Sequence, residues 1–142
     1  MNFMKLAEDY LKRAGSRGKD APAALARGDY PEAVRYSQEM VELCLKACLR
    51  MVDVEYPKVH DVGKVLQAER RRFPTSFARH IDRLAAVSRE LAEMRAASLY
   101  GIEAQGKGPA ELFDEESGEA SLAEAREVLE RAEALRKELT RA

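Results

Sequence analysis

The sequence predicts an all-α protein, an antiparallel up-and-down bundle of four to five helices built as a single domain over residues 1–142. Three observations support this prediction. Apolar residues recur at spacings of three and four over several long segments. Ala, Leu, Glu and Arg dominate the composition, and their side chains lose little freedom in a helix. No segment alternates between apolar and polar residues in the manner of a strand.

The first two helices are the clearest. One helix is expected over residues 2–27, with a kink or short break at residues 18–22, because Pro22 cannot donate a backbone hydrogen bond. A second helix is expected to begin at Asp29, whose carboxylate can cap it. The apolar stripe of this second helix, over residues 33–52, is wide, so the helix should lie at the centre of the fold.

The second half of the chain is predicted to contain three further helices. A short third helix begins at His60-Asp61, and a long fourth helix is capped by Thr75 or Ser76 and ends at Gly101.

Residues 101–119, rich in glycine and acidic residues, form the only long loop predicted. The last helix is expected to begin at the capping-box sequence of residues 121–124.

Composition and charge exclude several functional classes. The 24 Lys and Arg balance 25 Asp and Glu, so any basic site must be local. Aromatic residues make up 6% of the chain and Trp is absent, so a platform for stacking bases is not expected. No segment resembles a signal peptide or a membrane span, so a cytoplasmic location is expected.

Cysteine usage agrees with that location. Cys44 and Cys48 lie four residues apart in an apolar stretch and are predicted to be small core residues in a reducing compartment. No spacing typical of a metal site, a cofactor site or a catalytic triad occurs, so no metal, cofactor or catalytic residue is predicted.

Arg95 is the most informative anomaly, because it lies on an otherwise apolar helical stripe. A guanidinium in such a position must be paired, and Glu42 on the second helix is the predicted partner, with Lys46 facing the same polar channel. Two interpretations remain open. One is an internal network of salt bridges, or long side chains that extend to solvent at the bundle edge; the other is a charged groove that receives an anion such as phosphate.

A second basic region is local to the middle of the chain. Its predicted surface contacts are Arg72, Arg79 and Arg83, near a partly buried His80. The region is interpreted either as a solvated face that pairs with acidic residues elsewhere, the acidic loop included, or as a surface that contacts a phosphate backbone.

Four segments, taken in order, resemble the stand-alone prokaryotic branch of the HEPN domain family. They are ALARGDYPEAV at residues 24–34, QEMVELCLKA at residues 38–47, HDVGKVL at residues 60–66 and RAASLYG at residues 95–101. An acidic loop and an Ala-rich last helix follow, as in that branch. The resemblance implies a helical bundle that is often dimeric, and a homodimer is also expected here from the wide apolar stripe of the second helix.

The resemblance also bears on activity. Ribonucleases of the family carry Arg, four to six residues, and then His; here Arg95 is followed after four residues by Tyr100, and Arg72 is separated from His80 by seven. Because Tyr lacks the acid–base range of imidazole near neutral pH, no catalysis is expected.

The resemblance therefore implies a non-catalytic binding protein that binds a nucleotide, or that partners a minimal nucleotidyltransferase in a system of the toxin–antitoxin type. The candidate ligand-binding residues are Arg95, Lys46, His60 and Tyr100. The alternatives are a diverged ribonuclease that uses an Arg and His pair, and a purely structural helical adaptor.

Overall fold

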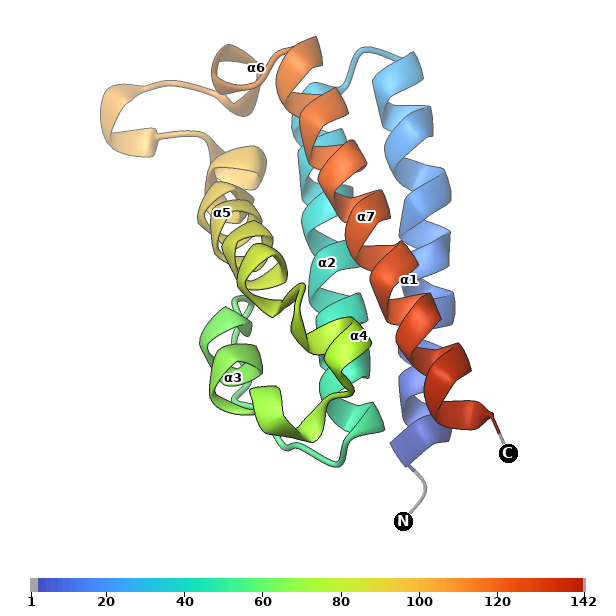
Figure 1. Ribbon diagram of the computed structural model, residues 1–142. Helices are drawn as coiled ribbons and strands as arrows, with labels where there is room; N and C mark the ends of the chain where they lie inside the picture. The colour runs from blue at the N-terminus through green and yellow to red at the C-terminus, as the bar shows by residue number, and fades with distance from the viewer. Residues whose placement is uncertain (1–2, 142) are drawn as a thin grey trace.

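A computed structural model describes residues 3–141. Its α-helices are α1 (Phe3–Ala26), α2 (Tyr30–Met51), α3 (Gly63–Ala68), α4 (Thr75–Ala78), α5 (Ile81–Tyr100), α6 (Pro109–Leu112) and α7 (Glu115–Thr140). Two short 3₁₀ turns, η1 (Arg70–Arg72) and η2 (Glu103–Gln105), connect them. The four long helices alternate in direction along one axis (Figure 1). This confirms the predicted all-α, antiparallel up-and-down bundle.

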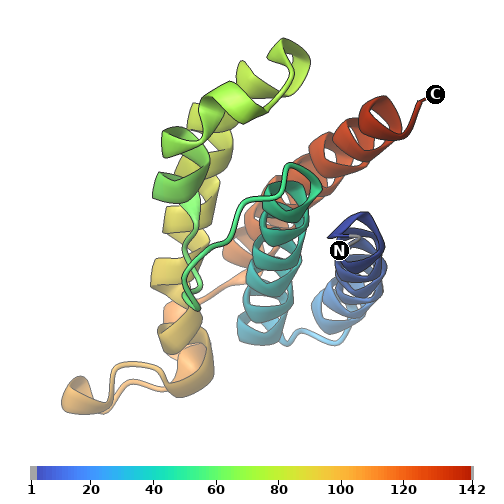
Figure 2. The ribbon, with the colours of Figure 1, turned by 90° about the horizontal axis from the view of Figure 1, so that it is seen from below.

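Helix α2 is the central element of the bundle, as its wide apolar stripe predicts. It contacts α1, α5 and α7, and Figure 2 shows it between α5 on one side and α1 on the other. The Asp29 carboxylate accepts a hydrogen bond from the Glu32 backbone N–H at 3.4 Å, which confirms the predicted cap.

Both cysteines lie on α2 and are fully buried as free thiols. Burial raises the pKa of Cys44 and of Cys48 well above the ordinary value, because a thiolate would lose its hydration there. The prediction that they are core residues is confirmed.

Helix α1 runs without the predicted break through Pro22 to Ala26. Helix α2 lies close against it at Gly18, where an added Cβ would lie 3.3 Å from the Met40 Cε atom. Tertiary packing along the whole of α1 therefore outweighs the local disturbance that Pro22 introduces.

The predicted long fourth helix is interrupted by a turn. Neither Thr75 nor Ser76 caps it: Pro74 occupies the N-cap position of α4, and the Ser76 hydroxyl donates to Glu138 Oε2 at 2.5 Å. Helix α5 then starts afresh at Ile81 after the turn at His80.

Helix α7 begins earlier than predicted, and two loops rather than one are long. Asp114 and Ser117 form the capping box, with the Asp114 carboxylate accepting from the Ser117 N–H at 2.9 Å, whereas Ser121 is buried inside the helix. Gly118 lies inside this helix, at a position where an added Cβ would lie 2.7 Å from a methyl carbon of Leu25. The second long connection covers residues 52–62, so α3 begins at Gly63 rather than at His60.

Candidate functional site

A polar groove lies where α1, α2, α5 and the 52–62 loop meet. Its volume is about 230 Å³. The residues that line it are Arg13 and Arg17 of α1, Glu39, Glu42 and Leu43 of α2, His60 of the loop and Arg95 of α5.

Hydrogen bonds at the end of the loop hold it against α5. The Asp61 carboxylate accepts from the Gly63 backbone N–H at 2.9 Å and from the Ser88 hydroxyl at 2.8 Å, and that hydroxyl accepts from the Val62 N–H at 3.2 Å. This clasp places the neighbouring His60 at the edge of α2, where its Nδ1 atom lies 2.7 Å from Glu42 Oε1.

Glu42 is the half-buried carboxylate at the centre of this side of the groove. Besides His60, it accepts hydrogen bonds from Gln38 Nε2 and Lys46 Nζ, both at 2.9 Å. Burial alone raises the pKa of Glu42, but these three hydrogen bonds and the Lys46 charge outweigh burial and leave the pKa below its ordinary value. Glu42 is therefore a carboxylate at neutral pH.

Glu39 is shared by guanidiniums from three directions. Its oxygens lie 2.9 Å from Arg17 Nε, 3.1 Å from Arg35 Nη1 and 3.2 Å from Arg95 Nη1. One carboxylate cannot neutralise three cations, although Arg35 has a second partner in Glu32 and Arg17 has one in Asp20, both at 2.8 Å.

The predicted direct contact between Arg95 and Glu42 is wrong. Arg95 Nη1 donates to Gln38 Oε1 at 2.7 Å, and the other end of that amide donates to Glu42. The buried Gln38 thus bridges the two charges, because α2 presents Gln38 and Glu39 to α5 at this level. Arg95 lines the surface groove with a side chain 24% exposed rather than lying in the bundle interior.

The groove carries a surplus of positive charge. Three guanidiniums line it against two carboxylates, a net charge of +1 with His60 neutral. Arg13 is exposed and makes no hydrogen bond or ion pair with any described residue, and Arg95 hydrogen-bonds to described residues through Nη1 alone. Donors therefore remain for an anionic ligand.

The structure brings together two of the four candidate ligand-binding residues, Arg95 and His60, on the groove wall. Lys46 does not line the groove itself, but its Nζ atom donates a hydrogen bond to Glu42, which does. Tyr100 is 66% exposed at the end of α5 and does not line the groove, because five residues rotate a side chain by about 140° around a helix.

The sequence reasoning missed Gln38, Glu39, Arg13 and Arg17. The spacing of Arg13 and Arg17, four residues apart, was the one available signal, since it places both on one face of a helix.

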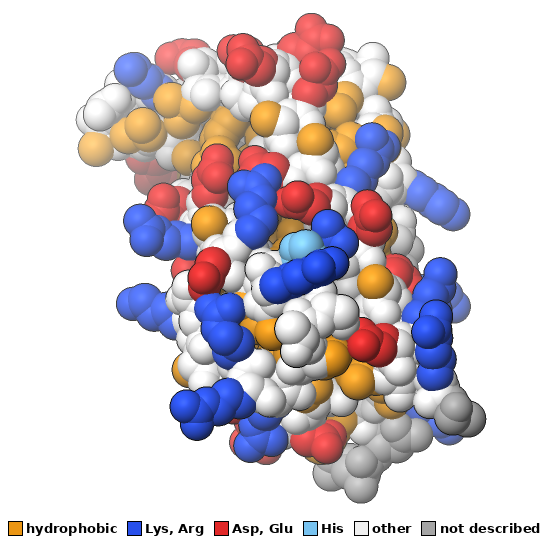
Figure 3. All heavy atoms as spheres, in the orientation of Figure 1, with side chains coloured by type: hydrophobic (Ala, Val, Ile, Leu, Met, Phe, Trp, Pro, Cys, Tyr) orange, Lys and Arg blue, Asp and Glu red, His pale blue; other side chains and the backbone are white. Residues whose placement is uncertain are grey.

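The predicted basic surface is largely paired. Arg72 contacts Glu69 at 2.8 Å, and Arg83 contacts Glu127 of α7 at 3.1 Å. Arg79, in contrast to these two residues, donates from Nε to His80 Nε2 at 3.3 Å. Figure 3 shows one face of the molecule, on which Lys and Arg side chains lie at both edges and near the centre. His80 is partly buried, as predicted.

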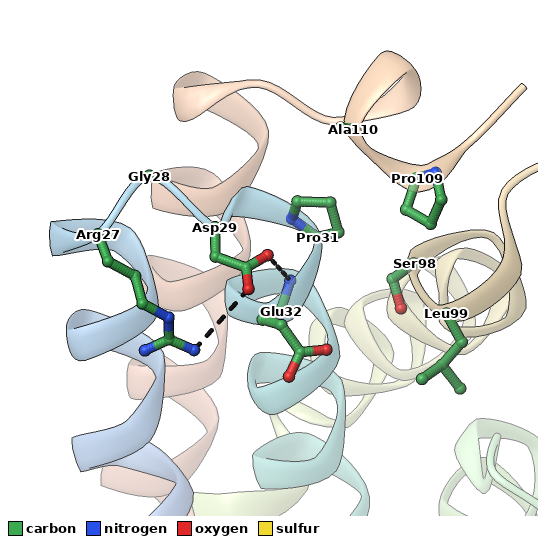
Figure 4. Close-up of a pocket in the computed structure, with 9 residues that line it drawn as sticks. All are labelled: Arg27, Gly28, Asp29, Pro31, Glu32, Ser98, Leu99, Pro109 and Ala110. Atoms are coloured by element: carbon green, nitrogen blue, oxygen red, sulfur yellow. Dashed lines mark hydrogen bonds and ion pairs between the residues drawn. The ribbon is translucent and has the colours of Figure 1, made fainter.

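A larger hollow, about 560 Å³, lies at one end of the bundle between the α1–α2 turn, α5 and α6 (Figure 4). Its acidic groups are engaged locally: Asp29 caps α2, and Glu32 pairs with Arg35. No candidate site residue lines it, so the groove is the better functional candidate. Within residues 3–141, no group of His, Cys, Asp and Glu side chains is placed to hold a metal ion.

The fold and the groove define an all-α bundle with a charged site between three helices. The HEPN domain model matches residues 7–137, and the chain therefore belongs to the HEPN domain family. The predicted family is confirmed.

Two solved structures share the fold. ST0689, an archaeal HEPN homologue, superposes with a TM-score of 0.67 at 20% identity, over 90% of this chain and 95% of that one. TT1696 from Thermus thermophilus superposes with a TM-score of 0.68 at 23% identity, over 90% of this chain and 96% of that one. A search of curated proteins found no match. Among the described residues, no helix is both long and apolar enough to cross a membrane.

Proposed function

We propose that this protein is a non-catalytic HEPN-type binding protein that takes the phosphate group of a nucleotide in the groove. The observation that carries the proposal is the convergence of Arg13, Arg17 and Arg95 on one hollow that only two carboxylates line. Guanidinium forks match the oxygen geometry of phosphate, and the groove keeps unused donors on Arg13 and Arg95.

The groove is built to hold phosphate rather than to read a base. Leu43 is its single apolar lining residue, and no aromatic ring lines it. Stacking would supply much of the affinity for a base, so the phosphate should dominate binding. Mono- and dinucleotides with different bases should therefore bind with similar affinities.

Calorimetry tests this proposal with ADP, and with adenosine as the matched ligand that lacks phosphate. We expect ADP to bind and adenosine not to bind. Arg95→Gln should weaken ADP binding about tenfold, because it removes a charged donor. The control Arg89→Gln, an exposed residue on the same helix, should leave affinity unchanged. Equal binding of adenosine, or equal loss in both variants, contradicts the proposal.

A second candidate function is RNA cleavage by a diverged Arg and His pair. The observation that favours it is that His60, hydrogen-bonded to Glu42, lines the same groove as Arg95. The pair of Arg72 and His80 is less favoured, since Arg72 is engaged by Glu69.

Incubation with mixed cellular RNA separates the two candidates. Intact RNA is expected for the binding protein. Cleavage that His60→Ala abolishes would establish the second candidate, and cleavage that only His80→Ala abolishes would move catalysis to the other face.

A nucleotidyltransferase partner is proposed on the family resemblance, with a purely structural adaptor as the alternative. Co-expression with a minimal nucleotidyltransferase, followed by co-purification, tests the partnership. An adaptor role is favoured if the partner binds equally well after Arg95→Gln and no nucleotide binds.

A homodimer is also proposed, but its interface is expected at the end of α5 rather than along the apolar stripe of α2. Within the monomer, α2 is covered by α1, α5 and α7, so its apolar stripe needs no second copy. Exposed apolar side chains instead gather at the end of α5, at Leu99, Tyr100 and Ile102. Light scattering at micromolar concentration should give a dimer, and Tyr100→Asp should give a monomer.

A further inference from the structure

A third hollow, here called the basic pocket, lies between α4 and the C-terminal half of α7. Both helices lie toward the viewer in Figure 1. Its volume is about 220 Å³. The residues that line it are Ser76, Phe77, Arg79, Arg131, Ala134, Leu135 and Glu138. Phe77 and Leu135 belong to the hydrophobic core, so the apolar part of the pocket is held rigidly by packing.

The two arginines of the basic pocket lack acidic partners. Among the described residues, the Arg79 side chain hydrogen-bonds only to the His80 ring, and the Arg131 side chain makes no hydrogen bond or ion pair. Glu138, the one acidic lining residue, accepts from the Ser76 hydroxyl and forms no ion pair with either guanidinium.

Two neighbouring arginines, Arg83 and Arg136, behave differently, since each of them pairs with a carboxylate. Arg83 pairs with Glu127 at 3.1 Å, and Arg136 pairs with Glu133 at 3.2 Å. Two guanidiniums from different elements that face one hollow, neither of them paired with a carboxylate of the described residues, are placed to share an anion.

The pKa of His80 reflects the positive charge around the basic pocket. Its pKa lies below the ordinary value, because partial burial and the charges of Arg131 and Arg79 all disfavour the imidazolium, while Glu127 opposes them. The neighbouring charges that face the ring therefore come from its own segment and from α7, and cations predominate among them.

We propose that the basic pocket binds a phosphate group between the guanidiniums of Arg79 and Arg131, with the His80 ring as a further donor when protonated. The proposal is independent of the groove, which lies between other helices and uses other residues. The phosphate group could belong to a small ligand or to an RNA backbone, and the chemistry of recognition is the same for both.

NMR of the histidine rings tests the proposal, because the chain has two histidines and each reports one site. His80→Gln assigns the two ring signals. Sodium phosphate is titrated against sodium chloride at equal ionic strength, and phosphate should shift the His80 signal in a saturable way and raise the pKa of His80. A shift confined to His60 would locate phosphate in the groove alone and overturn the proposal for the basic pocket.

Variants sharpen the test. Arg131→Gln should weaken the phosphate response of His80 about tenfold, because one of two guanidiniums is lost. The matched control is Arg126→Gln, an exposed arginine on the same helix outside the pocket, which should change nothing. An equal response in both variants, or in sodium chloride, overturns the proposal.

A parallel titration with a single-stranded oligouridylate distinguishes the sources of the phosphate. Saturation by free phosphate supports a small ligand. A response to the oligonucleotide alone, again lost in Arg131→Gln, supports an RNA backbone as the source.

Discussion

The groove and the basic pocket both contain arginine side chains, but most of those in the groove are paired with carboxylates and those in the basic pocket are not. In the groove, Arg17 and Arg95 are held by Glu39, and Gln38 fixes the end of Arg95. In the basic pocket, no described carboxylate holds Arg79 or Arg131. A paired guanidinium is fixed in place but loses part of its field, whereas an unpaired one keeps its full charge and its side-chain freedom.

Because of this difference, removing an arginine should affect the stability of the fold in the groove, but mainly the binding of a ligand in the basic pocket. In the groove, Arg17 and Arg95 are ordered before a ligand arrives, so binding to them costs little conformational entropy, and their removal should destabilise the fold. In the basic pocket an anion must order the arginines itself, and their removal should affect binding while leaving stability nearly unchanged.

The largest expected effect is the loss of the shared carboxylate. Glu39→Gln should lower the free energy of unfolding by about 2–3 kcal/mol, because three guanidiniums lose their common partner in a partly buried site. Urea unfolding measures it. The control Glu93→Gln removes an exposed pair with Arg89 and should cost less than about 0.5 kcal/mol. An equal loss of unfolding free energy in both variants would contradict the view that the paired arginines of the groove stabilise the fold.

Acid should weaken the groove through Glu42. Its pKa is lower in the folded chain than the ordinary value of 4.5, so its stabilising effect is fully present above pH 4.5 and is lost as the pH falls through the folded value. Glu42→Gln should cost about 1–2 kcal/mol at pH 7, and the difference from the unmodified chain should shrink below pH 4.5. A difference that stays constant with pH would contradict the assignment.

A double-mutant cycle between Gln38 and Arg95 should show a coupling of about 1 kcal/mol, since the two side chains share a hydrogen bond. The cycle combines Gln38→Leu and Arg95→Met in thermal melts. A cycle between Glu42→Leu and Arg95→Met should couple more weakly, because Gln38 separates them. A larger coupling energy between Glu42 and Arg95 than between Gln38 and Arg95 would instead support the direct contact between Arg95 and Glu42 that the sequence predicts.

The smallest effect belongs to the basic pocket. The pKa of His80 is lower in the folded chain than the ordinary value of 6.5, so the unfolded chain takes up the proton first as the pH falls. Stability should therefore decrease slightly as the pH falls from 6.5 through the folded value. Sodium phosphate should reduce this slope, and His80→Gln should remove it; a slope unchanged in His80→Gln would assign it to other groups.

The long helices were predictable because each carries a stripe that repeats over five or more turns. Their ends were less so. Gly118 carries the usual signal of a loop, yet it is small because α7 passes close to Leu25, a contact between distant segments that no local pattern encodes. The sequence Ser121 to Glu124 matches a capping box, but Ser121 is buried inside α7.

The site shows the same division. Arg95 could be found because a charge on an apolar stripe must have a partner. Which residue of α2 it meets depends on how far each helix is rotated about its axis, and the periodicity of one helix says nothing about its rotation relative to another. Gln38 and Glu39, rather than Glu42, therefore came from the structure alone.

The burial of Cys44 and Cys48 makes this chain convenient for site-directed labelling. Thiol reagents attack the thiolate, and both native thiols are enclosed by the bundle with their pKa values raised, so they stay inert at neutral pH. A cysteine introduced at an exposed position, such as Tyr100→Cys at the end of α5 or Arg126→Cys on α7, would react selectively. Fluorescent or spin labels can therefore be attached without first removing a native cysteine from the core.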